Sequence, residues 1–223
     1  MNKNYNNIIK YSLSTKTNNN SNINNHNNVP SNSSINITVS ADDETTNNWL
    51  AKHIIGRENV VGLDAEWSFT AQKQSRISLL QIATHDKVLI IRFTYKDKIL
   101  PLNLIEMLKS SSIIKTGVEV KQDLMKIRDF YNTTIGNYCD TSKVYHAHYN
   151  LPNTNPLGLY NLANKLFNTQ LVKNKSISKS NWDNTILKNS QLRYAALDAI
   201  LSRRIYDELS YKLKAKMIIE SAV

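Results

Sequence analysis

Residues 60–67 read Val-Val-Gly-Leu-Asp-Ala-Glu-Trp, an apolar run that leads into two carboxylates, Asp64 and Glu66. Side chains two positions apart point to the same face of a β-strand, so these two acids should lie side by side near the end of a buried strand. Mg²⁺ and Mn²⁺ prefer such oxygen ligands and usually share them with substrate phosphates. A solvated strand end also carries this pattern by chance, and its interpretation therefore depends on the rest of the chain.

The composition favours a basic protein with a polyanionic partner. The chain has 223 residues, with 28 Lys and Arg against 18 Asp and Glu, which gives a net charge of +10. Nucleic acid is the first candidate partner for such a charge, although a scattered basic surface has the same net charge. The single cysteine, Cys139, excludes an intrachain disulfide and a zinc cluster of thiolates. No apolar run approaches the roughly 20 residues that span a bilayer, so no membrane partner is expected.

The first 44 residues are dominated by Asn, Ser and Thr. Such a segment has too little apolar surface to offset the entropy of ordering its backbone, and we expect residues 1–44 to be a disordered tail. The first 40 residues contain no Asp or Glu, which leaves a mitochondrial presequence open, but they also contain no Arg. The folded domain is expected over residues 45–223.

Within that domain, apolar periodicity predicts an α/β fold with a mixed central sheet flanked by helices. Three apolar segments joined by short connections suggest an antiparallel meander, and helices and strands alternate after it. The expected strands are 60–66, 77–83, 87–93, 113–117 and 139–141, and the expected helices are 45–55, 102–108, 120–131, 157–167 and 189–214.

Two further acids stand where a metal site could use them. Asp123 falls at the start of the helix expected over 120–131, where a carboxylate is also stabilised by the helix N-terminus alone. Asp198 follows Tyr194 by four residues in the last helix, so the phenol and the carboxylate share one helix face. Small residues between them allow that helix to approach the sheet closely.

This order of motifs resembles the DEDDy branch of the DEDD 3′–5′ exonucleases, which has a ribonuclease-H-like fold. GLDAEW at 62–67, GVEVKQD at 117–123, and KSISKSNW at 175–182 followed by LRYAALDA at 192–199 are similar to the exonuclease domain of the Werner syndrome protein. The resemblance covers residues 45–214. One departure is that Leu124 and Met125 follow the second motif, where an aromatic residue is expected. That difference affects stacking on the substrate and leaves the acids unchanged.

The resemblance implies a two-metal phosphodiester hydrolase that uses Mg²⁺ or Mn²⁺, with the ions about 4 Å apart. Asp64 would bridge both ions, Glu66 and Asp198 would complete the ion that holds the attacking water, and Asp123 would hold the second ion. Tyr194 would orient the water through its hydroxyl. With an ordinary phenol pKa of about 10, it is a poor base by itself.

Candidate contacts to the nucleic acid lie near these acids. Trp67 follows the acid pair and could stack on the terminal nucleotide, although a core or rim tryptophan fits the pattern equally well. Lys175 and Lys179, together with Lys173, lie in a Ser-rich linker that could follow a phosphate backbone, and a solvated loop is the alternative.

The expected function is therefore removal of nucleoside monophosphates from nucleic-acid 3′ ends, with DNA favoured and a place in DNA metabolism or repair. The alternatives are RNA 3′-end trimming, as in relatives of ribonuclease D, and a catalytically silent nucleic-acid-binding module. A third is an α/β domain with coincidental acids. The DNA interpretation suggests a nuclear location and a separate helicase as a partner; cytoplasm and mitochondrion remain alternatives. The oligomeric state is not indicated by the sequence.

Overall fold

The computed structural model describes residues 8–12, 34–69, 75–94, 99–152, 155–213 and 220–222. Among these residues, eight strands form one mixed sheet in the order β1-β2-β5-β4-β3-β6-β7-β8. The strands are β1 Ile8–Ser12, β2 Ser34–Ser40, β3 Val60–Phe69, β4 Ser75–Ala83, β5 Lys87–Arg92, β6 Ile114–Gly117, β7 Ile135–Asp140 and β8 Glu220–Ala222. The helices are α1 Asp43–His53, α2 Leu102–Lys109, α3 Val120–Tyr131, α4 Thr141–His148, α5 Leu159–Phe167, α6 Lys175–Ser178 and α7 Asn189–Leu213.

Pairing in the sheet follows the expected meander and then changes direction. Strand β4 pairs antiparallel with both β3 and β5, while β3 pairs parallel with β6 and β6 pairs parallel with β7. The parallel pairs are connected through helices, as parallel strands require a crossover. The expected α/β fold with a mixed central sheet is confirmed.

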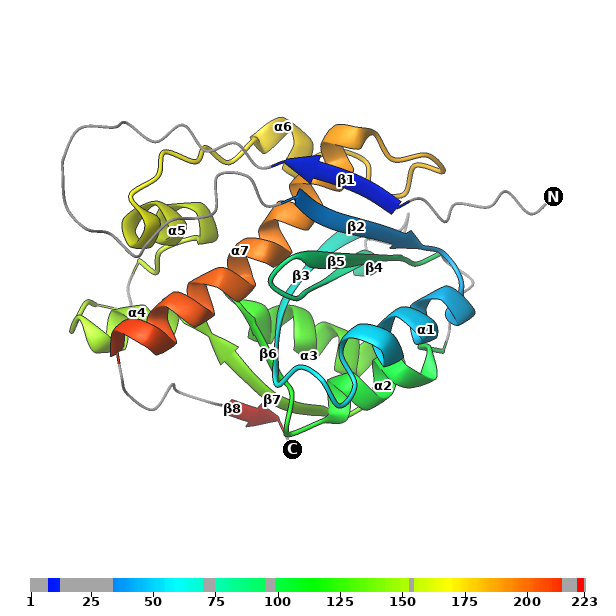
Figure 1. Cartoon of the computed structure of the whole chain (residues 1–223), viewed down its shortest axis with the longest axis horizontal. Helices are drawn as coiled ribbons and strands as arrows, with labels where there is room; N and C mark the ends of the chain where they lie inside the picture. Colours follow the sequence, from blue (N-terminus) through cyan, green and yellow to red (C-terminus); the bar gives the residue numbers. More distant parts are fainter. Residues whose placement is uncertain are drawn as a thin grey trace.

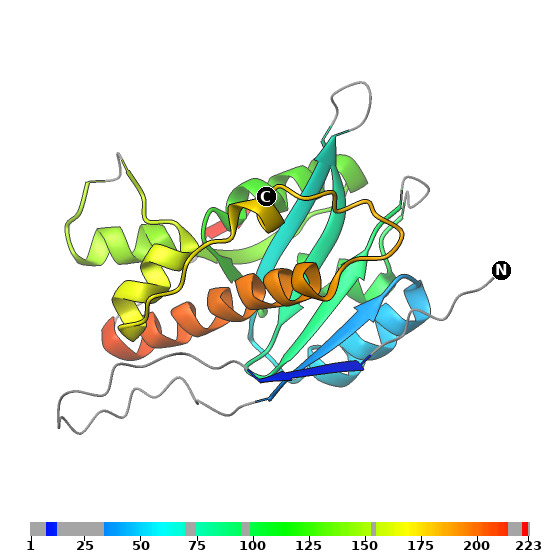
Figure 2. The ribbon, with the colours of Figure 1, turned by 90° about the horizontal axis from the view of Figure 1, so that it is seen from above.

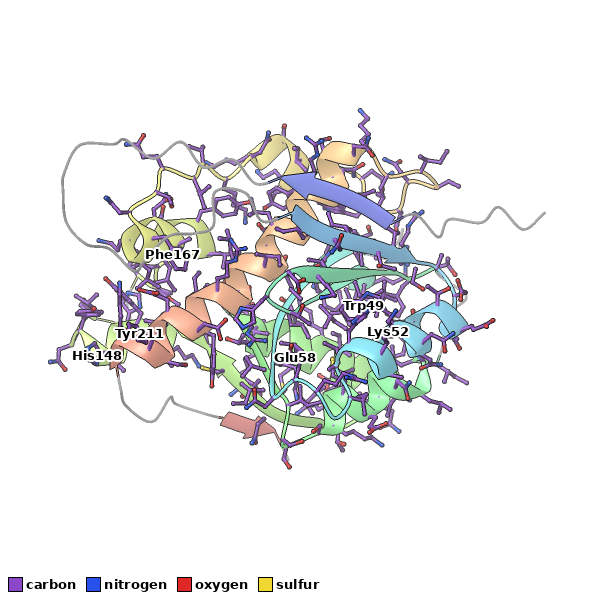
Figure 3. The ribbon with its side chains drawn as sticks, viewed as in Figure 1. Trp49, Lys52, Glu58, His148, Phe167 and Tyr211 are labelled. Carbon is purple, nitrogen blue, oxygen red and sulfur yellow. The ribbon has the colours of Figure 1, made fainter. Side chains whose placement is uncertain are left out.

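Helices cover both faces of the sheet (Figures 1 and 2). Helices α1, α2 and α3 enclose the main core against β3, β4 and β5, and Trp49 of α1 is buried there while its helix neighbour Lys52 is exposed (Figure 3). The long helix α7 crosses the other face, with α4 and α5 packed beside it. Three layers result, with the sheet in the middle.

Strand β3 divides its side chains between these two layers. Val61 and Leu63 are buried in the core under α1, α2 and α3. Because side chains alternate along a strand, Gly62, Asp64 and Glu66 face the α7 side. The local sequence thus places an apolar row on one face and the two acids on the other.

Contact between β3 and α7 is close because Gly62 has no side chain. A Cβ at this position would lie 2.1 Å from the carbonyl oxygen of Ala199 and 2.6 Å from the backbone nitrogen of Arg203. The Arg203 guanidinium, which is buried, donates from Nη1 to the carbonyl of Val60 at 2.6 Å and to Glu58 at 2.9 Å. These contacts hold the middle of α7 against the start of β3.

The expected boundary at residue 45 is wrong. Residues 34–40 form β2, which pairs parallel with β5 and buries Ile35, Ile37 and Val39, and α1 begins at Asp43 with Asp42 as its N-cap. The hydrophobic pattern does not predict this strand, because the Asn-rich surroundings lower the average hydrophobicity, although apolar residues alternate within the segment. Strand β1 also lies inside the expected tail. The rest of that tail, residues 1–7 and 13–33, lies outside the described residues.

The elements near Asp140 also differ from the expectation. The strand expected over 139–141 is β7, which is longer and ends at Asp140. Thr141 instead begins α4, a helix not expected, because the Asp140 carboxylate accepts from the backbone N–H groups of Ser142 and Lys143 as an N-cap. Cys139 is buried, as its place in a strand suggested. Within the described residues, no helix is both long and apolar enough to cross a membrane.

Candidate active site

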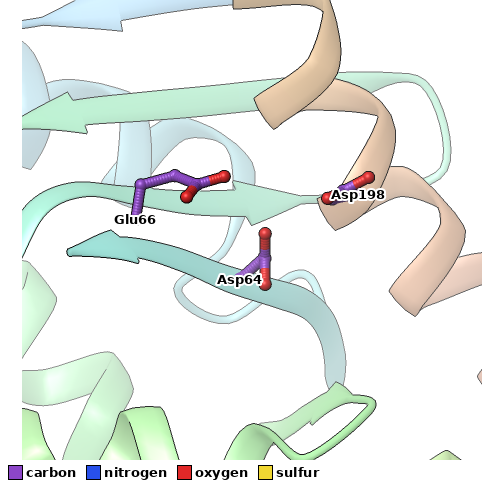
Figure 4. A group of neighbouring side chains, drawn as sticks. All are labelled: Asp64, Glu66 and Asp198. Carbon is purple, nitrogen blue, oxygen red and sulfur yellow. The ribbon is translucent and has the colours of Figure 1, made fainter. Parts of the chain in front are cut away.

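Three carboxylates meet between β3 and α7. Asp64 and Glu66 project from β3 and Asp198 from α7, and each offers an oxygen that lies within 4.8 Å of the other two (Figure 4). Asp198 is buried, and the other two are half-buried. Acids 132 residues apart in the chain, at positions 66 and 198, are therefore neighbours in the fold.

Asp123 reaches the same region from a different side. It lies in the first turn of α3, which follows directly after β6 ends at Gly117. Strand β6 pairs with β3 only from Val60 to Gly62. Among the described residues, the later part of β3 therefore has no strand partner on that side, and α3 contacts β3. Asp123 is not one of the three acids that meet within 4.8 Å, but its charge contributes to raising the pKa of Asp64 and of Glu66.

Trp67 holds Asp123 in place. Its indole Nε1 donates to Oδ1 of Asp123 at 2.8 Å, and the Lys126 ammonium lies 4.6 Å from the centre of the Trp67 ring. A β-bulge lies between Glu66, which faces α7, and Trp67, which contacts α3. The sequence suggested only a nucleotide contact, a core role or a rim role for Trp67. The hydrogen bond to Asp123 is an additional role, and the nucleotide contact stays a prediction.

The four acids all hold their protons more strongly than free carboxylic acids. Burial, followed by the charge of Asp198, raises the pKa of Asp64 well above its ordinary value and that of Glu66 to about 8. Burial also raises the pKa of Asp123 and of Asp198 to about 6 each. Clustered, partly desolvated carboxylates repel one another, and a divalent cation relieves that repulsion.

The donor set fits Mg²⁺ or Mn²⁺. It consists of carboxylate oxygens, which these hard ions prefer, and the cluster of three contains no thiolate or imidazole ligand. Gln81 lies directly across from Asp64 in the β3–β4 pair and is buried. Among the described residues, neither polar atom of its side-chain amide has a hydrogen-bond partner, so an unsatisfied polar group lies beside Asp64.

Tyr194 lies one turn before Asp198 on α7, as the spacing predicts. Its ring is buried between those of Tyr160 and Trp182, with centroid distances of 6.3 Å and 6.2 Å. Burial, followed by the charge of Asp198, raises the pKa of the Tyr194 hydroxyl above its ordinary value. The hydroxyl is therefore neutral at physiological pH and can position a water by hydrogen bonding rather than by removing its proton.

Sequence reasoning missed Tyr160. The hydroxyl of this buried residue on α5 donates to Oδ1 of Asp198 at 2.7 Å. The segment 157–167 shows only the apolar stripe of an amphipathic helix, and Tyr160 stands 38 residues before its partner. No spacing rule for a strand or a helix connects residues so far apart, so the sequence carried no signal for this contact.

The linker lysines are exposed, and the charge of Lys173 acts on the acids of the site. Asn174 caps α6 by accepting from the backbone N–H groups of Ser176 and Ile177, so the linker contains an ordered turn rather than only a loop. Lys175 begins α6, Lys179 follows it, and both side chains are exposed, as is Lys173. The charge of Lys173 lowers the pKa of Glu66 and of Asp198, but less than burial raises it.

A mixed sheet with two acids on its central strand, a third on a crossing helix and a fourth at a helix start defines the DEDD class of exonucleases, with a ribonuclease-H-like fold. The chain belongs to the 3′-5′ exonuclease family, whose model matches residues 37–214. The expected family membership is thereby confirmed, and the match also begins inside β2.

Named relatives and solved structures agree with this assignment. The chain is 29% identical over 187 residues to exonuclease 3′-5′ domain-containing protein 2 of Drosophila melanogaster, covering 82% of this chain and 31% of that protein. It is 29% identical over 153 residues to the bifunctional 3′-5′ exonuclease/ATP-dependent helicase WRN of Mus musculus, covering 68% of this chain and 11% of that protein. The chain thus spans less than a third of the length of each of these relatives.

Among solved structures, Escherichia coli RNase D, an exoribonuclease involved in structured RNA processing, has a TM-score of 0.62 at 18% identity, over 81% of this chain and 45% of that one. Brucella melitensis NrnC with bound Mg²⁺ has a TM-score of 0.59 at 23% identity, over 70% of this chain and 74% of that one. At these identities the two likenesses establish the shared fold.

Proposed function

We propose that this chain is a divalent-metal-dependent 3′–5′ exonuclease that releases nucleoside monophosphates from nucleic-acid 3′ ends, with DNA as the favoured substrate. The observation that carries the proposal is the convergence of Asp64, Glu66 and Asp198 within 4.8 Å on a fold of this family. A silent binding module has no use for three clustered carboxylates, which repel the phosphates of a nucleic acid unless a cation lies between them.

Mg²⁺ is the proposed ion and Mn²⁺ the alternative. Asp64, Glu66 and Asp198 would hold one ion, and Asp123 would help to hold a second with Asp64. When bound, such ions lower the pKa of water and stabilise charge on a leaving oxygen. The bound Mg²⁺ of the similarly folded NrnC supports this choice.

The remaining side chains would prepare the site for hydrolysis. The neutral hydroxyl of Tyr194 would orient the attacking water, since its place next to Asp198 lets it hydrogen-bond a water beside that carboxylate. Trp67 would keep Asp123 directed toward β3 through its indole N–H. The exposed Lys175 and Lys179 would follow the phosphate backbone of the strand that enters.

We favour DNA because the motifs resemble the exonuclease domain of the Werner syndrome protein, and because WRN, which matches 68% of this chain, is also a helicase. RNA trimming is the alternative, and the fold shared with RNase D supports it. Discrimination between the two rests on contacts to the 2′-OH, which lie outside the four acids. The DNA proposal carries with it a nuclear location and a separate helicase partner, which imaging of the tagged chain and its co-purification with a helicase would test.

The test measures release of label from a 3′-end-labelled DNA duplex with a recessed 3′ end, and from a matching RNA. Both substrates are incubated with Mg²⁺, Mn²⁺ or chelator and with the parent chain, Asp64→Ala or Asp198→Ala. Asp129→Ala is the matched control, because Asp129 is exposed on α3. We expect metal-dependent release of mononucleotides by the parent and the control, at a higher rate on DNA, and none by the two variants.

A faster rate on RNA would replace DNA by RNA as the proposed substrate. Intact label on both substrates, together with binding that persists in chelator, would reject the enzyme in favour of the binding module.

A further inference from the structure

Asp198 is contacted by a side chain from a second helix. Tyr160 lies in the first turn of α5, is buried, and donates from its hydroxyl to Oδ1 of Asp198 at 2.7 Å. This distance is typical of a strong O–H···O hydrogen bond to a carboxylate. A phenol with an ordinary pKa of about 10 carries its proton at neutral pH, so Tyr160 is the donor in this pair.

We propose that Tyr160 is a positioning residue of the metal site: its hydrogen bond to Oδ1 fixes the rotation of the Asp198 carboxylate, so that Asp198 presents an oxygen toward Asp64 and Glu66. The inference rests on the proposed metal-dependent function. Helix α7 sets only the direction of the Cα–Cβ bond of Asp198, and the Tyr194 hydroxyl, which also reaches this carboxylate, comes from the same helix. The hydrogen bond from Tyr160 adds a restraint from a second element.

The position of Tyr160 is itself well determined. Leu162, Ala163 and Leu166 of α5 are buried against α7, in a cluster that includes Ile205 and Leu209. The end of α5 is tied to the following loop, since the Asn164 amide donates to the Leu171 carbonyl at 2.8 Å and accepts from its N–H at 2.7 Å. Helix α5 is thus held at both its apolar face and its C-terminal turn.

Tyr160 also contacts the other tyrosine of the site. The Tyr160 and Tyr194 rings stack at a centroid distance of 6.3 Å and an interplanar angle of 21°. Asp198 and Tyr194 belong to one helix, whereas Tyr160 approaches them from α5. One side chain therefore fixes the carboxylate through its hydroxyl and supports the water-orienting tyrosine through its ring.

Substituting Tyr160→Phe separates these two contributions, because phenylalanine keeps the ring and loses the hydroxyl. Partners that orient metal ligands typically contribute about 10–100-fold to metal affinity or activity. We expect Mn²⁺ binding to the full chain, measured by calorimetry and by the electron paramagnetic resonance of free Mn²⁺, to weaken by about that factor. Exonuclease activity should recover toward the parent kcat when Mn²⁺ is raised to saturation, which a loss of chemistry alone would not allow.

Tyr206→Phe is the matched control, since Tyr206 is a buried tyrosine further along α7, in the cluster that contains Cys139. We expect it to bind Mn²⁺ like the parent. Equal Mn²⁺ affinities of Tyr160→Phe and the parent would overturn the inference.

Melting in chelator and in Mn²⁺ completes the test. Bound metal raises the melting temperature by an amount that increases with the logarithm of its affinity, so we expect a smaller Mn²⁺-induced rise for Tyr160→Phe than for the parent. A Tyr160→Phe chain that is unfolded in chelator would show that the hydrogen bond serves the fold. An unchanged Mn²⁺-induced rise would show that the hydrogen bond does not affect metal binding. Either result would overturn the inference. A parent chain that binds no Mn²⁺ would instead reject the metal-dependent function on which the inference rests.

Discussion

The two sides of the site are built by different means. On the α7 side, a helix packs directly on the backbone of β3 at Gly62, and this close packing brings Asp198 to Asp64 and Glu66. On the α3 side, Asp123 stands apart from that cluster and depends on one hydrogen bond from Trp67. Backbone packing tolerates little change, whereas a single side-chain contact can be lost with the fold intact. The two sides should therefore respond differently to substitution.

Gly62→Ala should have the largest effect among the following variants, because its Cβ would lie 2.1 Å from the Ala199 carbonyl oxygen. Helix α7 must move, which should cost about 1–3 kcal/mol of unfolding free energy. A displacement of Asp198 by about 1 Å should lower kcat about 100-fold. Thermal melting and mononucleotide release measure the two effects.

Gly158→Ala is the matched control, since a Cβ there meets no atom within 4 Å. Parent-like activity of Gly62→Ala would show that the β3–α7 contact does not position Asp198.

Trp67→Phe should have a smaller effect, confined to the α3 side. The substitution keeps an aromatic ring but removes the N–H that binds Asp123, and we expect about 10–100-fold weaker metal-dependent activity at a nearly unchanged melting temperature. Trp67→Leu separates the hydrogen bond from stacking on a nucleotide, because only this variant also removes the aromatic ring.

Equal losses in the Phe and Leu variants, with an unchanged KM, would assign the effect to Asp123. A normal Phe variant beside a Leu variant with raised KM would assign Trp67 to the nucleotide instead.

Glu66→Gln should alter the pH dependence of stability in chelator. Burial, then Asp198, raises the pKa of Glu66 from an ordinary 4.5 to about 8. The folded chain therefore binds more protons than the unfolded chain between these values, and stability falls as pH rises through this window. We expect the parent to lose about 5 °C of melting temperature between pH 5 and pH 8 through Glu66 and its neighbours, and Glu66→Gln to lose less.

A metal-saturated parent should lose less stability over the same pH range, since the bound cation favours the ionised acids. Asp129→Asn is the control on an exposed acid. A parent melting temperature that rises with pH in chelator would contradict the electrostatic description of the cluster.

Lys175→Ala with Lys179→Ala should have the smallest effect on catalysis. These exposed lysines are outside both sides of the carboxylate site, so kcat at saturating substrate should stay near that of the parent. If each contacts one phosphate, the dependence of log affinity on log salt should become shallower by about 2. Lys52→Ala with Lys109→Ala, on α1 and α2, is the control pair. An unchanged salt dependence would leave the linker as a solvated segment.

Local patterns predicted most of the central fold. The apolar segments that became β3, β4 and β5, and the helical stripe that became α3, lie where periodicity placed them. Strand β2 was missed because a short alternating segment is hidden in Asn-rich surroundings, and what makes it a strand is its pairing with β5, about fifty residues later in the chain. Helix α4 was missed because its eight residues have no clear apolar stripe, and its start depends on the Asp140 cap.

By itself, the sequence determined which acids could act together wherever the relation was local. Two residues along a strand place Asp64 beside Glu66, and four residues along a helix place Tyr194 beside Asp198, since the backbone geometry of each element fixes these directions. Only the tertiary structure decided that Tyr160 binds Asp198 and that Trp67 binds Asp123, across 38 and 56 positions of the chain. Contacts of that kind follow from how helices pack on the sheet, which no short period along the chain encodes.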